Sequence, residues 1–181
     1  MDPKYIKAVR AGLVGALLLV VIYIVIHVVF YWAVSKPSVL EWVQNQSAES
    51  PTPYPTGLSQ LPSEVLVAGV AVCGGALMIF AVYFFVGVLA AKFTVSMSQG
   101  AIDLLLLGAL AGAVAQGVSA PFTELIAIVL NGGVQGDIIS WFLRFLLSEY
   151  VIFMIIAVVP AALAALVAGA MFKAFGTSKK E

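Results

Sequence analysis

Asp103 and Glu124 are carboxylates in apolar stretches of the chain, where an ionised side chain is costly and marks a candidate ion or proton site. Asp103 falls in the first turn of an expected helix, where the helix dipole and lipid headgroups stabilise a carboxylate; the alternative is an ion ligand. Glu124 follows Pro121, and it either pairs with Arg144, caps its own helix, or acts as a coupling carboxylate. No expected span centre carries a charge, which counts against an ion pathway within one copy.

Tyr23, His27 and Tyr31 are spaced four residues apart and therefore share one helix face. Gln116 and Ser119 are expected at a similar depth on another helix. We expect these side chains to form a polar patch. The patch either hydrogen-bonds internally or lines a pocket for a lipid headgroup or a cofactor tail.

The chain shows no catalytic or metal-binding pattern. His27 and Cys73 are the sole members of their residue types, which leaves too few nitrogen and sulfur ligands for a typical zinc site. Ser119 is the candidate nucleophile expected at the same depth as His27, but the sequence around it lacks the Gly-x-Ser-x-Gly motif of serine hydrolases. We therefore expect no enzyme activity, no catalytic residue, no bound metal and no cofactor.

The composition predicts a membrane protein. The 181 residues are 62% hydrophobic and 10% charged, with a mean hydropathy of +1.10. Soluble domains are about 25% charged, so the composition excludes a soluble enzyme and a disordered chain. Nine basic residues balance nine acidic residues, so we expect no nucleic-acid partner.

The apolar residues form four long blocks that must position the polar side chains. Each block is long enough to cross about 30 Å of hydrocarbon, where a backbone without internal hydrogen bonds is too costly. The expected class is an all-α integral membrane protein, with residues 1–181 forming a single membrane domain. Its transmembrane helices form a bundle, with spans at about 11–34, 65–91, 101–118 and 150–172.

The end of the third span has two interpretations. Either one helix extends to residue 130 with a kink at Pro121, or the helix stops near Val118 and a short helix restarts at Pro121. We favour the break, because proline suits a first helical turn and a span needs fewer than 30 residues.

Two segments are expected on the outer side of the membrane. Residues 35–63 form a proline-rich loop that includes a short helix at 39–46. Residues 131–149 form a short amphipathic segment, either re-entrant or interfacial, between spans three and four.

The positive charges predict the orientation. With the N-terminus in the cytoplasm, the inner segments hold seven lysines and arginines and the outer segments hold two. This positive-inside bias places both termini in the cytoplasm, and we expect the plasma membrane as the location.

Small residues recur at helical spacing in the third and fourth spans. The third carries Gly108 and Gly112, and the fourth carries Ala157, Ala161, Ala165 and Gly169. Because the hydrophobic effect does not drive helix association in lipid, such residues favour it by permitting close backbone approach. The stripes serve either packing within the chain or contact with a partner.

These features predict a non-enzymatic packing or assembly subunit of a membrane complex, or a self-associating bundle. Its expected partners are the lipid bilayer, copies of itself and other membrane subunits. The alternative is a small oligomeric transporter or channel that uses Asp103, Glu124 and the face formed by Tyr23, His27 and Tyr31.

Overall fold

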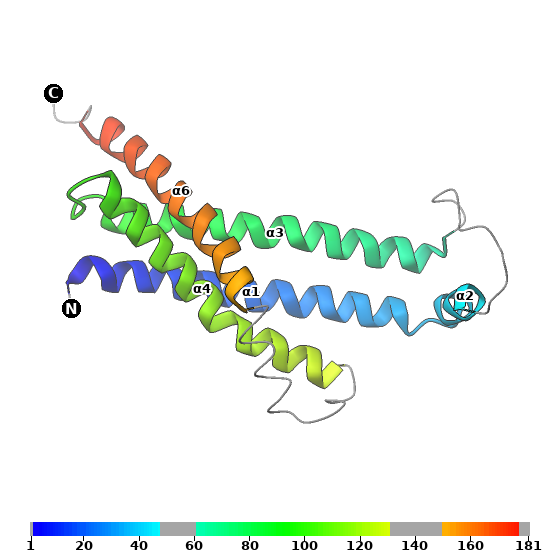
Figure 1. Cartoon of the computed structure of the whole chain (residues 1–181). Coiled ribbons are helices and arrows are strands. Elements are labelled where there is room, and N and C mark those ends of the chain that lie inside the picture. The colour runs from blue at the N-terminus through cyan, green and yellow to red at the C-terminus, as the bar shows by residue number, and fades with distance from the viewer. Residues whose placement is uncertain (1, 48–60, 131–149, 178–181) are drawn as a thin grey trace.

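A computed structural model describes residues 2–47, 61–130 and 150–177, and these residues are helical with short connections and no strand (Figure 1). Within these ranges, four helices are long and apolar enough to cross a membrane. The helices of the described residues are α1 (Pro3–Val34), α2 (Pro37–Ser47), α3 (Ser63–Thr94), α4 (Ala101–Leu130) and α6 (Tyr150–Thr177). The prediction of an all-helical chain with four apolar helices of spanning length is confirmed.

The helices extend beyond the predicted apolar blocks. α1 begins at Pro3 rather than at residue 11, and the Asp2 carboxylate caps it by accepting a hydrogen bond from the Lys4 backbone nitrogen at 3.0 Å. Its 32 residues span about 48 Å, which is more than the roughly 30 Å of hydrocarbon that a membrane span has to cross. α2 corresponds to the short helix expected at 39–46, whereas residues 48–60 and 131–149 lie outside the described part of the chain.

The expected break before Pro121 is wrong, because α4 is one helix that contains this proline. Proline removes one backbone donor. The hydroxyls of Ser119 and Thr123, on either side of it, donate to backbone carbonyls one turn earlier at 3.3 and 2.8 Å. In apolar surroundings a complete break leaves more unpaired backbone groups than a continuous helix does, which favours continuity.

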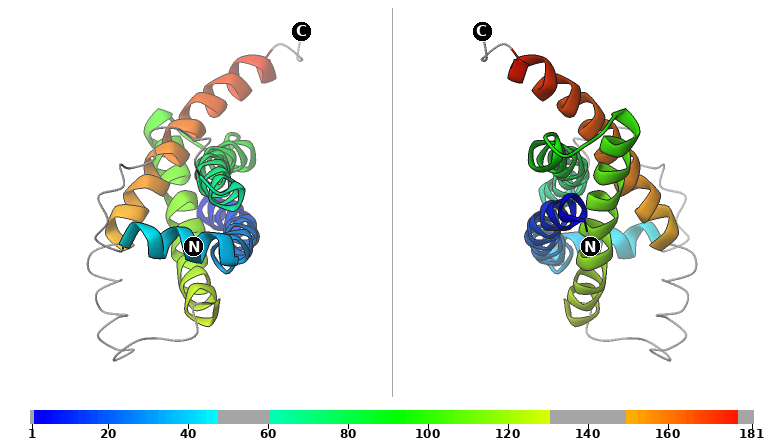
Figure 2. Two further views of the ribbon diagram at one scale, coloured as in Figure 1. Left: turned by 90° about the vertical axis from the view of Figure 1, so that its right-hand side faces the viewer. Right: turned by 90° about the vertical axis from the view of Figure 1, so that its left-hand side faces the viewer.

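The four long helices form two pairs, and one pair extends beyond the other at one end of the molecule. α1 lies beside α3, and α4 packs against α6 (Figures 1 and 2). The α4–α6 pair crosses the α1–α3 pair at the end where α1 begins. The start of α1 and the end of α6 lie at this same end of the molecule. The opposite halves of α1 and α3, toward α2, project beyond α4 and α6 (Figure 1).

Small residues bring the crossing helices into contact. A Cβ atom built on Gly108 lies 2.6 Å from the carbonyl oxygen of Ala161, and one built on Gly112 lies 2.7 Å from that of Ala157. Gly169 faces the side chain of Leu104. The two stripes, whose alanines are fully buried, therefore contact each other between α4 and α6.

Candidate functional site

A small polar cavity lies between three helices. It has a volume of about 90 Å³, and α1, α4 and α6 contribute its walls. We call it the polar cavity; its lining residues are Tyr23, His27, Gln116, Ala120, Thr123, Glu124 and Phe153. By liquid volume this space corresponds to about three water molecules.

The α1 wall consists of Tyr23 and His27, one helical turn apart. The Nδ1 atom of His27 lies 2.9 Å from the backbone oxygen of Tyr23. Because a carbonyl only accepts hydrogen bonds, Nδ1 carries the proton, and Nε2 of a neutral imidazole is an acceptor. The two ring centroids are 6.3 Å apart and the planes are tilted by 47°.

The α4 wall is held by a buried hydrogen bond to α3. The Tyr83 hydroxyl donates to the amide oxygen of Gln116, and both residues are at most 3% exposed. The Thr123 hydroxyl, about two turns farther along α4 than Gln116, donates to the Ala120 carbonyl. No buried side-chain nitrogen or oxygen in the described residues lacks a hydrogen-bond partner, so this wall is internally satisfied.

Glu124 brings a carboxylate into the cavity lining. It follows Pro121 on the continuous part of α4 and is partly buried. Apart from the imidazole of His27, the lining holds no basic side chain.

The structure brings together four of the six predicted polar residues. Tyr23, His27, Gln116 and Glu124 share the polar cavity, as the helical spacing on α1 suggested. Tyr31 does not line it and is 52% exposed.

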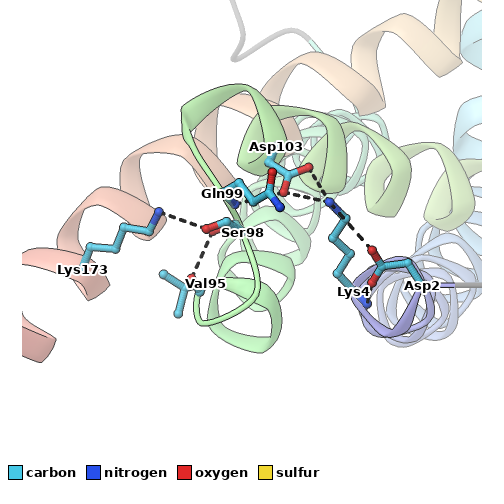
Figure 3. Close-up of polar contacts among 7 residues, drawn as sticks. All are labelled: Asp2, Lys4, Val95, Ser98, Gln99, Asp103 and Lys173. Atoms are coloured by element: carbon cyan, nitrogen blue, oxygen red, sulfur yellow. Dashed lines mark hydrogen bonds and ion pairs between the residues drawn. The ribbon is translucent and has the colours of Figure 1, made fainter.

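Asp103 lies far from the cavity and forms an ion pair. It precedes Glu124 by 21 residues, or about 32 Å along α4. Both of its carboxylate oxygens lie 2.9 Å from the Lys4 ammonium, and one accepts a hydrogen bond from the Gln99 backbone nitrogen (Figure 3). This contact joins the start of α1 to the start of α4, a structural role that the sequence analysis did not anticipate.

The same end of the molecule holds a second polar link. The Lys173 ammonium on α6 donates to the Ser98 carbonyl at 3.4 Å, and Ser98 lies in the turn between α3 and α4 (Figure 3). Lys4, Asp103 and Lys173, from three different helices, therefore lie near one another at one end of the molecule.

Sequence reasoning missed Tyr83, Thr123 and Phe153. Tyr83 had a usable signal, because a tyrosine inside an apolar span needs a partner for its hydroxyl. Thr123 lies close to Pro121, and hydroxyl groups beside a proline in an apolar helix often donate to nearby backbone carbonyls, as this one does to the Ala120 carbonyl. Phe153 had no signal, because a phenylalanine is ordinary in an apolar helix.

A second, apolar cavity lies between the projecting halves of α1 and α3. Its volume is about 430 Å³. We call it the α1–α3 groove; its lining residues are Val21, Ile22, Val25, Ile26, Val29, Val70, Ala71, Gly74, Gly75 and Met78. Exposed side chains such as Val70 and Met78, at 73% and 60%, form its rim.

Among the described residues, no group of three or more histidines, cysteines, aspartates or glutamates is placed to hold a metal ion. The comparisons with known proteins find no matching family model, no matching curated protein and no matching solved structure.

Proposed function

We propose that this chain is a non-enzymatic assembly subunit of a membrane complex, and that a partner transmembrane helix occupies the α1–α3 groove. The observation that carries the proposal is that the α1–α3 pair extends beyond the α4–α6 pair. The projecting halves of α1 and α3 contact each other, while their apolar side chains remain exposed on the sides that α4 and α6 do not reach.

The small-residue stripes of α4 and α6 support this choice of surface. Because Gly108 and Gly112 already face the backbone of α6, those stripes cannot receive a partner unless the pair separates. A partner that leaves the four-helix arrangement intact must therefore use another face. Of the two cavities described above, the α1–α3 groove is the larger one and is lined by apolar residues.

Glycine usage favours a helix over lipid as the occupant. Several glycines lie where two helices are in close contact, so that a Cβ would meet atoms of the neighbouring helix: Gly12, Gly87, Gly108 and Gly112. Gly74 lines the groove, yet a Cβ built on it meets no atom within 4 Å. A glycine open on a groove wall permits the same close approach to one further helix.

The separation of Ser119 from His27, the one catalytic pair considered from the sequence, supports a non-enzymatic role. Ser119 is fully buried, donates its hydroxyl proton to a backbone carbonyl and does not line the cavity that contains His27. A serine nucleophile needs a base within hydrogen-bond reach.

The proposed location is the plasma membrane with both termini in the cytoplasm. The distribution of lysines and arginines supports this orientation. The position of the start of α1 and the end of α6 at one end of the molecule is consistent with it (Figure 1).

The transporter alternative receives less support. A pathway that uses both predicted carboxylates has to connect the polar cavity with the Lys4–Asp103 pair, about 32 Å away along α4. Between them, Gly108 and Gly112 pack directly against the backbone of α6, and Leu107 is fully buried.

Gly74→Leu tests the assembly role, with Gly69→Leu as its matched control. Both glycines lie on α3 with open space around a Cβ, but Gly69 does not line the groove. Native mass spectrometry in mild detergent, from the membranes in which the chain is made, measures the complex. We expect a stoichiometric partner that Gly74→Leu releases and Gly69→Leu retains.

The masses also identify the partner. Two copies of the chain indicate self-association through the groove, and a different subunit indicates a hetero-complex. A monomer with bound lipid in every preparation, or a complex that both variants keep, contradicts the proposal.

A further inference from the structure

We propose that the surface between α1 and α4 binds one anionic glycerophospholipid, with the lipid phosphate on Arg10 and an acyl chain in an adjoining apolar groove. This inference does not rest on the assembly role, because the surface is separate from the α1–α3 groove. It rests on the lining of the groove, on the position and charge of Arg10, and on the distance between the two ends of the site.

The apolar part of the site is a groove of about 250 Å³ between α1 and the second half of α4. We call it the α1–α4 groove; its lining residues are Leu13, Ala16, Leu17, Val20, Val118 and Phe122. Most of these side chains are exposed, so the groove opens on the outer surface of the four helices. In a membrane-spanning chain such a surface contacts lipid.

Helical spacing places Arg10 at one end of this groove. Arg10 precedes Leu13 by three residues and Leu17 by seven, so the three share one face of α1. Arg10 is exposed. Because Cα–Cβ bonds tilt toward the start of a helix, this arrangement favours a guanidinium beyond the groove, on the side where α1 begins.

The length of the site matches one leaflet of a bilayer. Arg10 and Val20 are ten residues apart, or about 15 Å along α1. The hydrocarbon of a bilayer is about 30 Å thick, so one leaflet contributes about 15 Å. A lipid whose phosphate pairs with Arg10 can therefore extend an acyl chain along the groove as far as Val20.

The charge of Arg10 is not balanced within the described residues. α1 contains no aspartate or glutamate, and the Asp103 carboxylate at the start of α4 is bound by Lys4. Within the described ranges no ion pair involves Arg10. Lys7, about one turn earlier on α1, adds a second positive charge. This end of α1 therefore complements an anion.

The chemistry of arginine selects an anionic phospholipid headgroup. A guanidinium presents its N–H donors in a planar fork that matches two phosphate oxygens. In phosphatidylcholine the ammonium of the headgroup balances the phosphate, whereas phosphatidylglycerol keeps a net negative charge. Basic residues beside a membrane are attracted to such anionic lipids.

The shape of the lining favours an acyl chain over a partner helix. Helix association in lipid depends on close approach of the backbones, which small residues permit. The α1–α4 groove has no glycine in its lining, and its exposed Leu17 and Phe122 side chains protrude from the two helices. The α1–α3 groove, in contrast, has the open Gly74. A flexible acyl chain adapts to the space between large side chains.

Native mass spectrometry of the full chain measures the dissociation constant of the first bound lipid. The chain is purified in mild detergent, freed of bound lipid, and titrated with phosphatidylglycerol or phosphatidylcholine that carry identical acyl chains. We expect phosphatidylglycerol to bind about fivefold more tightly, which is the equivalent of about 1 kcal/mol for one basic residue beside an anionic lipid. Glycerophosphoglycerol, the same headgroup without acyl chains, should bind far more weakly than the lipid.

Charge variants test the role of Arg10. Arg10→Gln should remove most of the preference for phosphatidylglycerol, because it removes the positive charge. Arg10→Lys should keep part of the preference, because it retains the charge and loses the planar fork. Lys92→Gln is the matched control: Lys92 is exposed in the last turn of α3, at the same end of the molecule, and does not line the groove. It should keep the preference of the parent.

A groove variant tests the acyl-chain contact independently of charge. Leu17→Ala should weaken the binding of both lipids about two- to fivefold, because the chain loses contacts, and should leave their ratio unchanged. Leu163→Ala is its control, since Leu163 is an exposed leucine of α6 outside the groove. It should bind both lipids as the parent does.

Five results overturn the inference. Equal affinity of the parent for the two lipids removes the selection by charge. A preference that Arg10→Gln keeps, or that Lys92→Gln loses to the same extent, indicates a diffuse charge effect. Unchanged binding in Leu17→Ala separates the lipid from the groove. Binding of glycerophosphoglycerol as tight as that of the lipid assigns Arg10 to a soluble phosphate. A protein subunit that Leu17→Ala releases assigns the groove to a helix.

Discussion

Gly112→Ala is expected to destabilise the chain by forcing α4 away from α6. A Cβ at position 112 lies 2.7 Å from the Ala157 carbonyl oxygen and 2.8 Å from the Ala161 Cβ. Ordinary contact begins at about 3.4 Å, so the approach is about 0.7 Å too close. The Ala157 atom belongs to helix backbone, which cannot rotate aside as a long side chain can.

The magnitude follows from close packing. Overpacking of this kind costs about 1–3 kcal/mol, because the helices must separate and lose contact along their length. Alanine also forms helix better than glycine by up to about 1 kcal/mol, which partly masks the loss. Gly69→Ala isolates this gain, since a Cβ there meets no atom within 4 Å.

Reversible unfolding in mixed micelles, with helix content and helix–helix proximity as readouts, measures the free energy of unfolding. We expect Gly112→Ala to be about 1–3 kcal/mol less stable than Gly69→Ala. Adding Ala161→Gly should restore only part of the loss, because it removes the Cβ contact and leaves the carbonyl contact. Equal stability of the two alanine variants would refute the packing argument.

Three further predictions concern the polar contacts and α4. Tyr83→Phe should lower the free energy of unfolding by about 1–3 kcal/mol, because the buried Gln116 amide loses its partner. The double variant with Gln116→Leu should recover most of this loss. An unchanged free energy of unfolding in Tyr83→Phe would contradict the hydrogen bond. Asp103→Asn should speed hydrogen exchange at the Gln99 amide and in the first turns of α1. High salt should also speed exchange at these amides in the parent protein, because it screens the ion pair. Unchanged exchange in both experiments argues against the ion pair. Spin labels at the exposed positions Ile102 and Leu125 should lie about 35 Å apart along one continuous helix, and a clearly shorter distance by electron paramagnetic resonance indicates a break at Pro121.

Part of the candidate site was predictable from local spacing. Tyr23 and His27 lie four residues apart, so any helix places them on one face, and the structure finds both in the polar cavity. Tyr31 obeys the same spacing but lies one turn beyond the end of the cavity. Spacing within one helix therefore predicts the shared face, and the neighbouring helices decide how much of that face is enclosed.

Pro121 shows where local rules give the wrong answer. In water, a proline after a full-length span favours a restart, because water satisfies the backbone groups at the break. Apolar surroundings do not satisfy them, so a continuous helix that loses one hydrogen bond at Pro121 is favoured over a complete break. The interpretation failed because it weighed the proline preference above the solvent.

The sequence by itself determined the class of the protein and the number of long apolar helices, because the length and hydropathy of each block are local properties and hydrocarbon requires internally hydrogen-bonded backbone. Only the tertiary structure decided that Asp103 pairs with Lys4, that Tyr83 holds Gln116, and that the stripes of α4 and α6 face each other. These contacts join residues far apart in the chain, so they depend on the angle and depth at which whole helices cross. Each long helix is apolar on all of its faces, so hydropathy alone does not specify which face packs against a neighbour. The crossing geometry therefore comes from close packing among the small residues.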